Sequence, residues 1–213
     1  MGLPGYAGKV LRIDVERQMF DVDELDTSAF KNFLGSRGLG AFLLSKTLRP
    51  KVEPLSPDNP LIFMTGPLTG TKFLSTPKYA AVTKSPLTGF YTHSLASGRF
   101  GLSLKSRGYD GILITGKAEK STYISLTEKG VGFHDAGPLW GMNTCDDFRF
   151  ERTVRSEGRS PLYRSRWGKP RSNCLCVFGK PDSWTRWCWS RDGFQTPKGN
   201  RDKGGWRKSW AFQ

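Results

Sequence analysis

The chain has 213 residues, with 33 Lys and Arg against 19 Asp and Glu and a formal net charge of +14. This length accommodates one large domain or two small ones with a buried core. No apolar run approaches the roughly 18 residues of a membrane span, and the N-terminus lacks the basic and then apolar pattern of a signal segment, so we expect a cytoplasmic protein that binds no membrane.

The N-terminal sequence predicts a β-hairpin followed by two short helices. Residues 8–25, GKVLRIDVERQMFDVDEL, alternate apolar and polar positions on both sides of a polar break near Arg17, which is typical of a hairpin. In residues 25–48 the apolar spacing changes to that of a helix. A Thr-Ser pair caps the first helix, Gly35 can take the left-handed backbone at its end, and a second helix includes Leu39.

The central sequence predicts two related hairpins. Apolar strands in residues 59–73 and 78–90 each run into the same tetrapeptide, PLTG, in which Pro and Gly indicate a turn. Short apolar strands follow, and the organised region spans about residues 4–143. From residue 148 onward no window keeps the period of a helix or a strand.

Six stretches occur in order over about 140 residues: GYAGKVLRIDV, FLGSRGLGAFLL, PLSPDNPLIFMTGPLTGT, YAAVTKSPLTGF, SGRFGLSLKSRGYDGILITGKAEK and DAGPLWGMNT. Together they closely resemble the N-terminal domain of the aldehyde ferredoxin oxidoreductase family. The resemblance implies an α+β, β-rich fold of two antiparallel sheets with a few short helices. We expect this domain to span residues 4–145 and to form the base on which pterin cofactors sit.

The resemblance also implies the chemistry of a complete enzyme. Such enzymes contain tungsten, or in some members molybdenum, with two pterins and one four-iron four-sulfur (4Fe-4S) cluster. They oxidise aldehydes to carboxylic acids and pass electrons to ferredoxin, and a homo-oligomer is compatible with the family. The cluster cysteines and the acid/base residues belong to later domains, and this chain ends before them. We therefore expect the 213-residue polypeptide alone to be an inactive fragment that retains no cofactor.

The stretch THSLASGRFG, residues 92–101, is the strongest local candidate for a cofactor contact. A loop of small residues lets backbone N–H groups approach a phosphate or a pterin edge, although an ordinary hairpin loop has the same composition. The family resemblance implies cofactor-binding positions at Lys78 and at four consecutive residues. These are Leu95, Ala96, Ser97 and Gly98.

Two of these positions depart from the family pattern. Relatives usually have Asn followed by small residues and Gly-Gly where this chain begins with Leu95, so a contact through the Asn side chain is lost while backbone contacts can persist. Relatives often have Arg in place of Lys78, and Lys keeps the charge but lacks the bidentate fork of Arg. The sequence predicts no catalytic residue and no metal ligand in this chain.

Three other patterns are interpreted without a functional site. His93 and His134 have no Cys or carboxylate at metal-ligand spacing and are interpreted as surface or packing residues. GSRGLG, residues 35–40, lacks the preceding strand and the later acidic residue of a dinucleotide fingerprint. The C-x-C pair and one distant Cys near the C-terminus match no four-ligand zinc spacing.

The C-terminal part of the chain departs from the family completely. From Asp147 onward 16 Lys and Arg stand against 6 Asp and Glu, and six of the seven tryptophans lie there. The single tryptophan codon, TGG, becomes a glycine codon when it is read one nucleotide later, and the shifted frame is compatible with a Gly-rich continuation of the family. We interpret residues 146–213 as a non-homologous, frameshifted and disordered tail.

In two other interpretations the basic tail is translated in its correct frame and has a function. In the first, cations bind phosphates and tryptophans stack on bases, as in a nucleic-acid-binding protein. This interpretation is less favoured because the aromatic residues belong to no recognisable nucleic-acid-binding motif. In the second, the chain is a scaffold or interaction protein derived from the pterin-binding base.

The frame hypothesis predicts the nucleotide sequence. One base gained, or two lost, near the codons for residues 145–148 produces the observed tail. Genomic sequencing across codons 140–150 should therefore reveal a long open frame, read one base later, that encodes the cluster cysteines. Early stop codons in that frame, or a translation unlike the family, would contradict the hypothesis.

Overall fold

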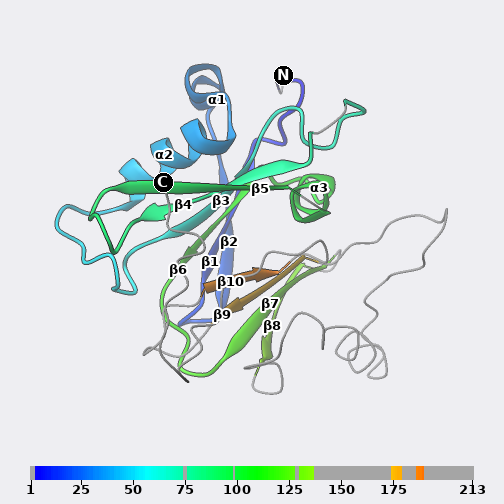
Figure 1. Ribbon diagram of the computed structural model, residues 1–213. Coiled ribbons are helices and arrows are strands. Elements are labelled where there is room, and N and C mark those ends of the chain that lie inside the picture. The colour runs from blue at the N-terminus through cyan, green and yellow to red at the C-terminus, as the bar shows by residue number, and fades with distance from the viewer. Residues whose placement is uncertain are drawn as a thin grey trace, which may run out of the picture.

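The computed structural model describes residues 3–73, 76–97, 99–127, 130–136, 174–178 and 186–189. Within these residues the chain forms two β-sheets and three short helices (Figure 1). The predicted class, α+β and rich in β-structure, is confirmed. The three helices are α1 (Thr27–Phe33), α2 (Ser36–Thr47) and α3 (Arg99–Ser106).

The larger sheet has six strands in the order β2-β1-β6-β3-β4-β5. All neighbouring pairs are antiparallel except β1 and β6, which run parallel, and between these two strands the chain forms the three helices and four other strands. The sequence did not predict this parallel pair. The strands are β1 (Lys9–Asp14), β2 (Met19–Glu24), β3 (Leu61–Thr65), β4 (Lys78–Lys84), β5 (Tyr91–Ser97) and β6 (Gly111–Thr115).

The smaller sheet is antiparallel throughout, in the order β10-β9-β7-β8. Two of its strands, β9 (Cys174–Phe178) and β10 (Arg186–Trp189), lie within residues 146–213, the region expected to be a disordered tail. The rest of that region is outside the described residues, and the expectation of disorder stays a prediction. The sequence of β9, CLCVF, is apolar throughout, and β9 is an interior strand of this sheet, between β10 and β7. The other two strands are β7 (Thr122–Thr127) and β8 (Gly130–Asp135).

Helices α1 and α2 cover one face of the larger sheet (Figure 1). Leu39, Leu43 and Leu44 lie on one side of α2 at helical spacing and are buried against alternate residues of the strands. A Cβ atom on Gly40 would lie 2.8 Å from Cγ2 of Val82, so glycine lets the helix approach β4 closely. The remaining members of this core are Val10, Ala29, Phe30, Ile62, Met64, Ala80 and Leu113.

The connection between α1 and α2 differs from the sequence prediction. Leu34, not Gly35, has left-handed backbone at the end of α1, with φ of 57°, and Gly35 is extended. Glycine is nevertheless required at position 35, because a Cβ atom there would lie 3.0 Å from the carbonyl oxygen of Thr65 and 3.2 Å from Cα of Gly66. The constraint is therefore a close approach of two backbones.

Helix α3 and β7 contribute to the core on the opposite face of the larger sheet. Phe100 and Leu104 of α3 are fully buried there, and the rings of Phe63 and Phe100 meet edge to face with centroids 5.5 Å apart. Ile124 and Leu126 of β7 belong to the same core. The two faces of the larger sheet are therefore both covered, which explains why β6, with sequence GILIT, is buried along most of its length.

Asp110, just before β6, joins several of these elements. Its carboxylate accepts hydrogen bonds from the backbone N–H groups of Ala7 and Gly8, at 2.9 and 2.7 Å, and forms an ion pair with Lys105 of α3. Its backbone carbonyl accepts hydrogen bonds from both the N–H and the hydroxyl of Thr65, at 2.8 and 2.7 Å. Since the Asp110 side chain is 1% exposed, these bonds form away from water.

Substitution of Asp110 should destabilise the fold strongly. Asp110→Asn removes the charge opposite Lys105, whose side chain is only 13% exposed, and breaking a buried pair in this way is expected to lower the free energy of unfolding by about 3 kcal/mol. Arg12→Gln is the control, because it breaks an ion pair with Asp23 whose side chains are 49% and 34% exposed and should lower this free energy by less than about 1 kcal/mol. Equal, small losses in urea denaturation would contradict the role given to Asp110.

Candidate functional site

The structure brings together residues that lie nearly twenty positions apart in the sequence. Lys78 is the first residue of β4 and Ser97 is the last residue of β5, and the two are direct partners in the antiparallel register. Both are exposed, and Leu95 is 52% exposed. Four of the five predicted cofactor-binding residues therefore lie on this strand pair, and the fifth, Gly98, is outside the described residues.

The stretch 92–101 is not the loop that the sequence predicted. Its residues up to Ser97 belong to strand β5, and helix α3 begins at Arg99. The loop prediction failed because small residues such as Ser94 and Ala96 are compatible with both structures, and pairing with β4 along seven residues decides the outcome. The small residues therefore lie on an ordered strand rather than on a hairpin loop.

The register of β4 and β5 also decides which face each side chain occupies. Tyr79 and Ala96 are partners and contact the core beneath α3, whereas Ala80, the partner of Leu95, belongs to the core beneath α2. Because side chains alternate along a strand, Lys78, Leu95 and Ser97 lie on one face of the sheet and Ala96 lies on the other.

Strand β5 is at the edge of the larger sheet, next to α3 (Figure 1). Its outer side is paired with none of the strands that the structure describes. An edge strand presents backbone N–H and C=O groups in alternation along its outer side. The edge thus offers hydrogen-bonding groups beside the small side chains of Ala96 and Ser97.

The first PLTG turn contributes a residue that the sequence did not single out. Thr69 is 4% exposed, and its hydroxyl oxygen accepts a hydrogen bond from the N–H of Gly66 at 3.2 Å and donates one to the carbonyl of Lys78 at 3.1 Å. In the second PLTG turn Leu87 is 88% exposed, and the hydroxyl of Thr88 accepts a bond from the N–H of Phe90 at 3.3 Å. Identical tetrapeptides could not reveal this difference.

The two histidines have contacts typical of surface and packing residues. Nε2 of His93 lies 3.3 Å from a guanidinium nitrogen of Arg37, and Nε2 of His134 lies 2.9 Å from the hydroxyl of Ser125. The ring of His134 also stacks on that of Tyr123, with centroids 4.7 Å apart. In the part of the chain that the structure describes, no group of three or more His, Cys, Asp or Glu side chains could hold a metal ion.

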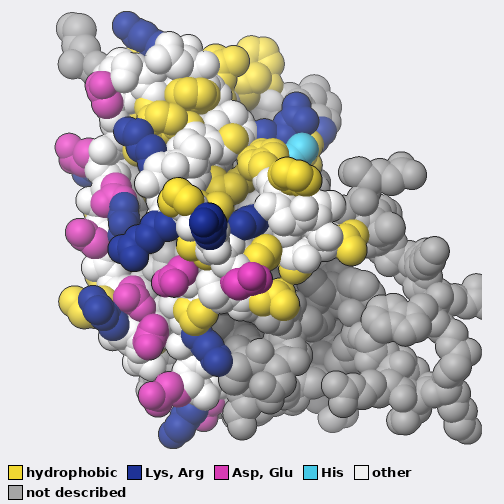
Figure 2. Space-filling model, turned by 90° about the vertical axis from the view of Figure 1, so that its left-hand side faces the viewer, with side chains coloured by type: hydrophobic (Ala, Val, Ile, Leu, Met, Phe, Trp, Pro, Cys, Tyr) yellow, Lys and Arg dark blue, Asp and Glu magenta, His cyan; other side chains and the backbone are white. Residues whose placement is uncertain are grey.

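The exposed side chains are mixed in character. Figure 2 shows one face on which Lys and Arg alternate with Asp and Glu and with scattered hydrophobic groups. A single-sign basic surface, which nucleic-acid binding favours, is not seen on this face. The tail residues 146–173, 179–185 and 190–213, on which that alternative depends, are outside the described residues.

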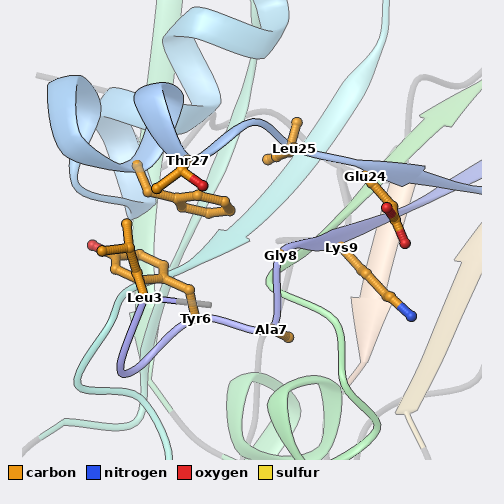
Figure 3. A pocket seen from close by; sticks show the side chains of 9 residues that line it. Leu3, Tyr6, Ala7, Gly8, Lys9, Glu24, Leu25 and Thr27 are labelled. Carbon is orange, nitrogen blue, oxygen red and sulfur yellow. The ribbon is translucent and has the colours of Figure 1, made fainter. Parts of the chain in front are cut away.

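A small cavity of about 200 Å³ lies between the N-terminal segment, the open end of the β1–β2 hairpin and α1 (Figure 3). It contains none of the predicted cofactor-binding residues. Burial, and after it the nearby carboxylate of Asp110, raises the pKa of the Tyr6 phenol above its ordinary value. The residues that line the cavity are Leu3, Tyr6, Ala7, Gly8, Lys9, Glu24, Leu25, Thr27 and Phe30.

Residues 10–160 match the family described as "Aldehyde ferredoxin oxidoreductase, N-terminal domain". The chain is 43% identical over 153 residues to the tungsten-containing aldehyde ferredoxin oxidoreductase of Pyrococcus furiosus, a match that covers 72% of this chain and 25% of that protein. It is 41% identical over 180 residues to an aliphatic sulfonate oxidoreductase, WOR-like subunit, of the same organism, covering 82% of this chain and 28% of that protein.

A solved structure has the same fold. The active-site complex BamBC of benzoyl coenzyme A reductase, in complex with 1,5-dienoyl-CoA, superposes with a TM-score of 0.67 and 28% identity, over 73% of this chain and 23% of that one. The chain thus spans about a quarter of the length of the relatives it matches. The family match continues to residue 160, and the expected domain boundary near residue 145 stays a prediction.

No helix in the described ranges is long and apolar enough to cross a membrane. Neither the matched family nor the relatives named above are described as nucleic-acid-binding or scaffold proteins.

The environment of Tyr6 predicts how stability changes at high pH. A raised pKa in the folded state contributes stability that is fully present below the unfolded pKa, near 10, and is lost as the pH rises through the folded pKa. Stability should therefore fall above about pH 10, and Tyr6→Phe should fall less steeply because it cannot ionise. Urea denaturation across this range measures the difference. Parallel curves for the two proteins would contradict the assignment.

Proposed function

Because this chain belongs to the aldehyde ferredoxin oxidoreductase family through its N-terminal domain, we propose that the paired ends of β4 and β5 form part of a tungsten-pterin binding surface. The observation that carries the proposal is the register pair of Lys78 and Ser97, which places a cation beside a strand edge with small side chains. Lys78, Leu95 and Ser97 then face the cofactor from one side of the sheet.

The chemistry of these groups fits a phosphorylated pterin. The ammonium of Lys78 suits a phosphate, and the hydroxyl of Ser97 and the outer backbone groups of β5 suit the donors and acceptors along a pterin edge. The exposed side chain of Leu95 offers apolar contact to the ring. When bound, the tungsten-pterin supplies the redox chemistry of the reaction, while these residues bind and orient it.

The two departures from the family pattern define what this site lacks. Lys78 attracts a phosphate as a point charge. Arg would in addition form two parallel hydrogen bonds to the phosphate. Leu95 does not supply the amide that Asn provides in relatives. We infer that recognition of the pterin depends on the backbone of β5 more than on side chains, and that one domain alone binds it weakly.

For the complete enzyme we propose oxidation of an aldehyde to a carboxylic acid, with electrons passed to ferredoxin through a 4Fe-4S cluster. The relatives are named for an aldehyde, for an aliphatic sulfonate and for benzoyl coenzyme A. Since their shared part includes this domain, we propose that it holds the cofactor and that other parts of the enzyme select the substrate. A cytoplasmic location and a homo-oligomeric enzyme belong to the same proposal.

Binding of 6-hydroxymethylpterin phosphate tests the surface. Lys78→Gln should weaken binding of this probe about tenfold and leave binding of unphosphorylated 6-hydroxymethylpterin unchanged, because only the phosphate meets the lysine. Lys78→Arg should bind at least as tightly as the wild type. Leu95→Asn should tighten binding of both probes, because it restores the amide. Titration of pterin fluorescence measures the affinity of the wild type and of the three variants for each probe.

Lys31→Gln is the matched control, since Lys31 is an exposed lysine on α1. It should bind both probes as the wild type does. If Lys78→Gln and Leu95→Asn leave both affinities unchanged, the β4–β5 edge is not a pterin-binding surface.

A further inference from the structure

The segment between β3 and β4 is held at both of its ends by threonine side chains. At the end of β3, the hydroxyl of Thr65 donates to the carbonyl of Asp110 at 2.7 Å. Four residues later, the hydroxyl of Thr69 donates to the carbonyl of Lys78 at 3.1 Å. Both threonines are buried, so the beginning of β4 is tied back to the centre of the sheet.

Thr69 contacts the start of β4 and the helix that follows β5. Its hydroxyl reaches the backbone of Lys78, at the start of β4. Its methyl group packs beside the backbone of Gly101 in α3, where a Cβ atom would lie 3.4 Å from Cγ2 of Thr69. Helix α3 begins two residues after Ser97. One buried side chain thus fixes both Lys78 and the helix that follows β5.

The second PLTG turn shows that the sequence motif alone does not require such a contact. There the hydroxyl of Thr88 bonds to the N–H of Phe90 within the same hairpin, and the turn lies at the exposed tip between β4 and β5. Thr88 therefore stabilises its own turn locally. Thr69 reaches across nine positions of the sequence to the residue that carries the proposed phosphate-binding cation.

We propose that Thr69 is a positioning residue for pterin binding, which holds the backbone of Lys78 so that its ammonium meets the phosphate at the β4–β5 edge. This inference rests on the proposed function and adds a residue to it. The hydroxyl, which bonds to two backbone groups, is the part that acts on Lys78. Loss of the hydroxyl leaves the charge of Lys78 intact but frees the backbone that carries it.

A double-mutant cycle with 6-hydroxymethylpterin phosphate tests the inference. Thr69→Val, which keeps the shape but loses the hydroxyl, should weaken binding about fivefold, whereas Thr69→Ser should bind within about twofold of the wild type. Adding Thr69→Val to Lys78→Gln should weaken binding no further, because Thr69 acts through Lys78. Thr88→Val, the same change in the other PLTG turn, should leave the affinity unchanged. Thr69→Ala replaces Thr69→Val in the cycle if the valine variant does not fold.

The outcomes separate this inference from the proposed function. If Lys78→Gln weakens binding while Thr69→Val does not, the positioning role is wrong and the pterin surface stands. Additive losses in the double variant would also overturn it, because Thr69 would then act independently of Lys78. If neither Lys78→Gln nor Thr69→Val changes the affinity, the pterin surface itself is wrong and the inference fails with it.

Discussion

The fold of the described residues depends on the ion pair and hydrogen bonds of the buried Asp110 carboxylate. Asp110 stands where the N-terminal segment, α3, β3 and β6 meet. Its carboxylate bonds to the N-terminal segment and to α3, and its backbone carbonyl accepts a hydrogen bond from Thr65 of β3. Burial of a carboxylate charge costs free energy unless a cation and hydrogen-bond donors compensate for the lost water. Lys105 and two backbone N–H groups supply that compensation. The N-terminal segment and α3 must therefore both be in place for Asp110 to be buried without a large cost in free energy.

The candidate site inherits its geometry from this point through a short series of contacts. Thr65 bonds to the backbone of Asp110, the first PLTG turn follows Thr65, and Thr69 at that turn bonds to Lys78. The register of β4 and β5 then places Lys78 opposite Ser97. None of these steps requires a charged network at the edge itself. In the proposed function, a cation on an ordered backbone beside open hydrogen-bonding groups binds the cofactor, and no metal-ligating cluster is required in the described part of the domain.

The relatives suggest a common role for this domain, and the residues of the candidate site suggest how that role tolerates changes in side chains. Relatives named for chemically different substrates share this domain, which favours a common role with respect to the cofactor. In the proposed function, Lys78 and Leu95 stand where the family resemblance implies Arg and Asn, and each difference replaces a directional side-chain contact with a weaker one. The backbone of β5 is unaffected by such changes. A site that is built on an edge strand therefore tolerates side-chain variation that would abolish a site made of side chains alone.

Local periodicity in the sequence determined the first hairpin, the helices α1 and α2, and the apolar strands, because each of these patterns reflects burial on one side of an element. The tertiary structure alone decided the parallel pairing of β1 with β6, the strand in place of a loop at residues 92–97, and the close backbone approach that requires Gly35. It also decided that Thr69 and Thr88, in identical tetrapeptides, have different partners, and that Lys78 meets Ser97. These features depend on contacts between residues distant in the chain, and neither composition nor spacing specifies which distant residues will meet.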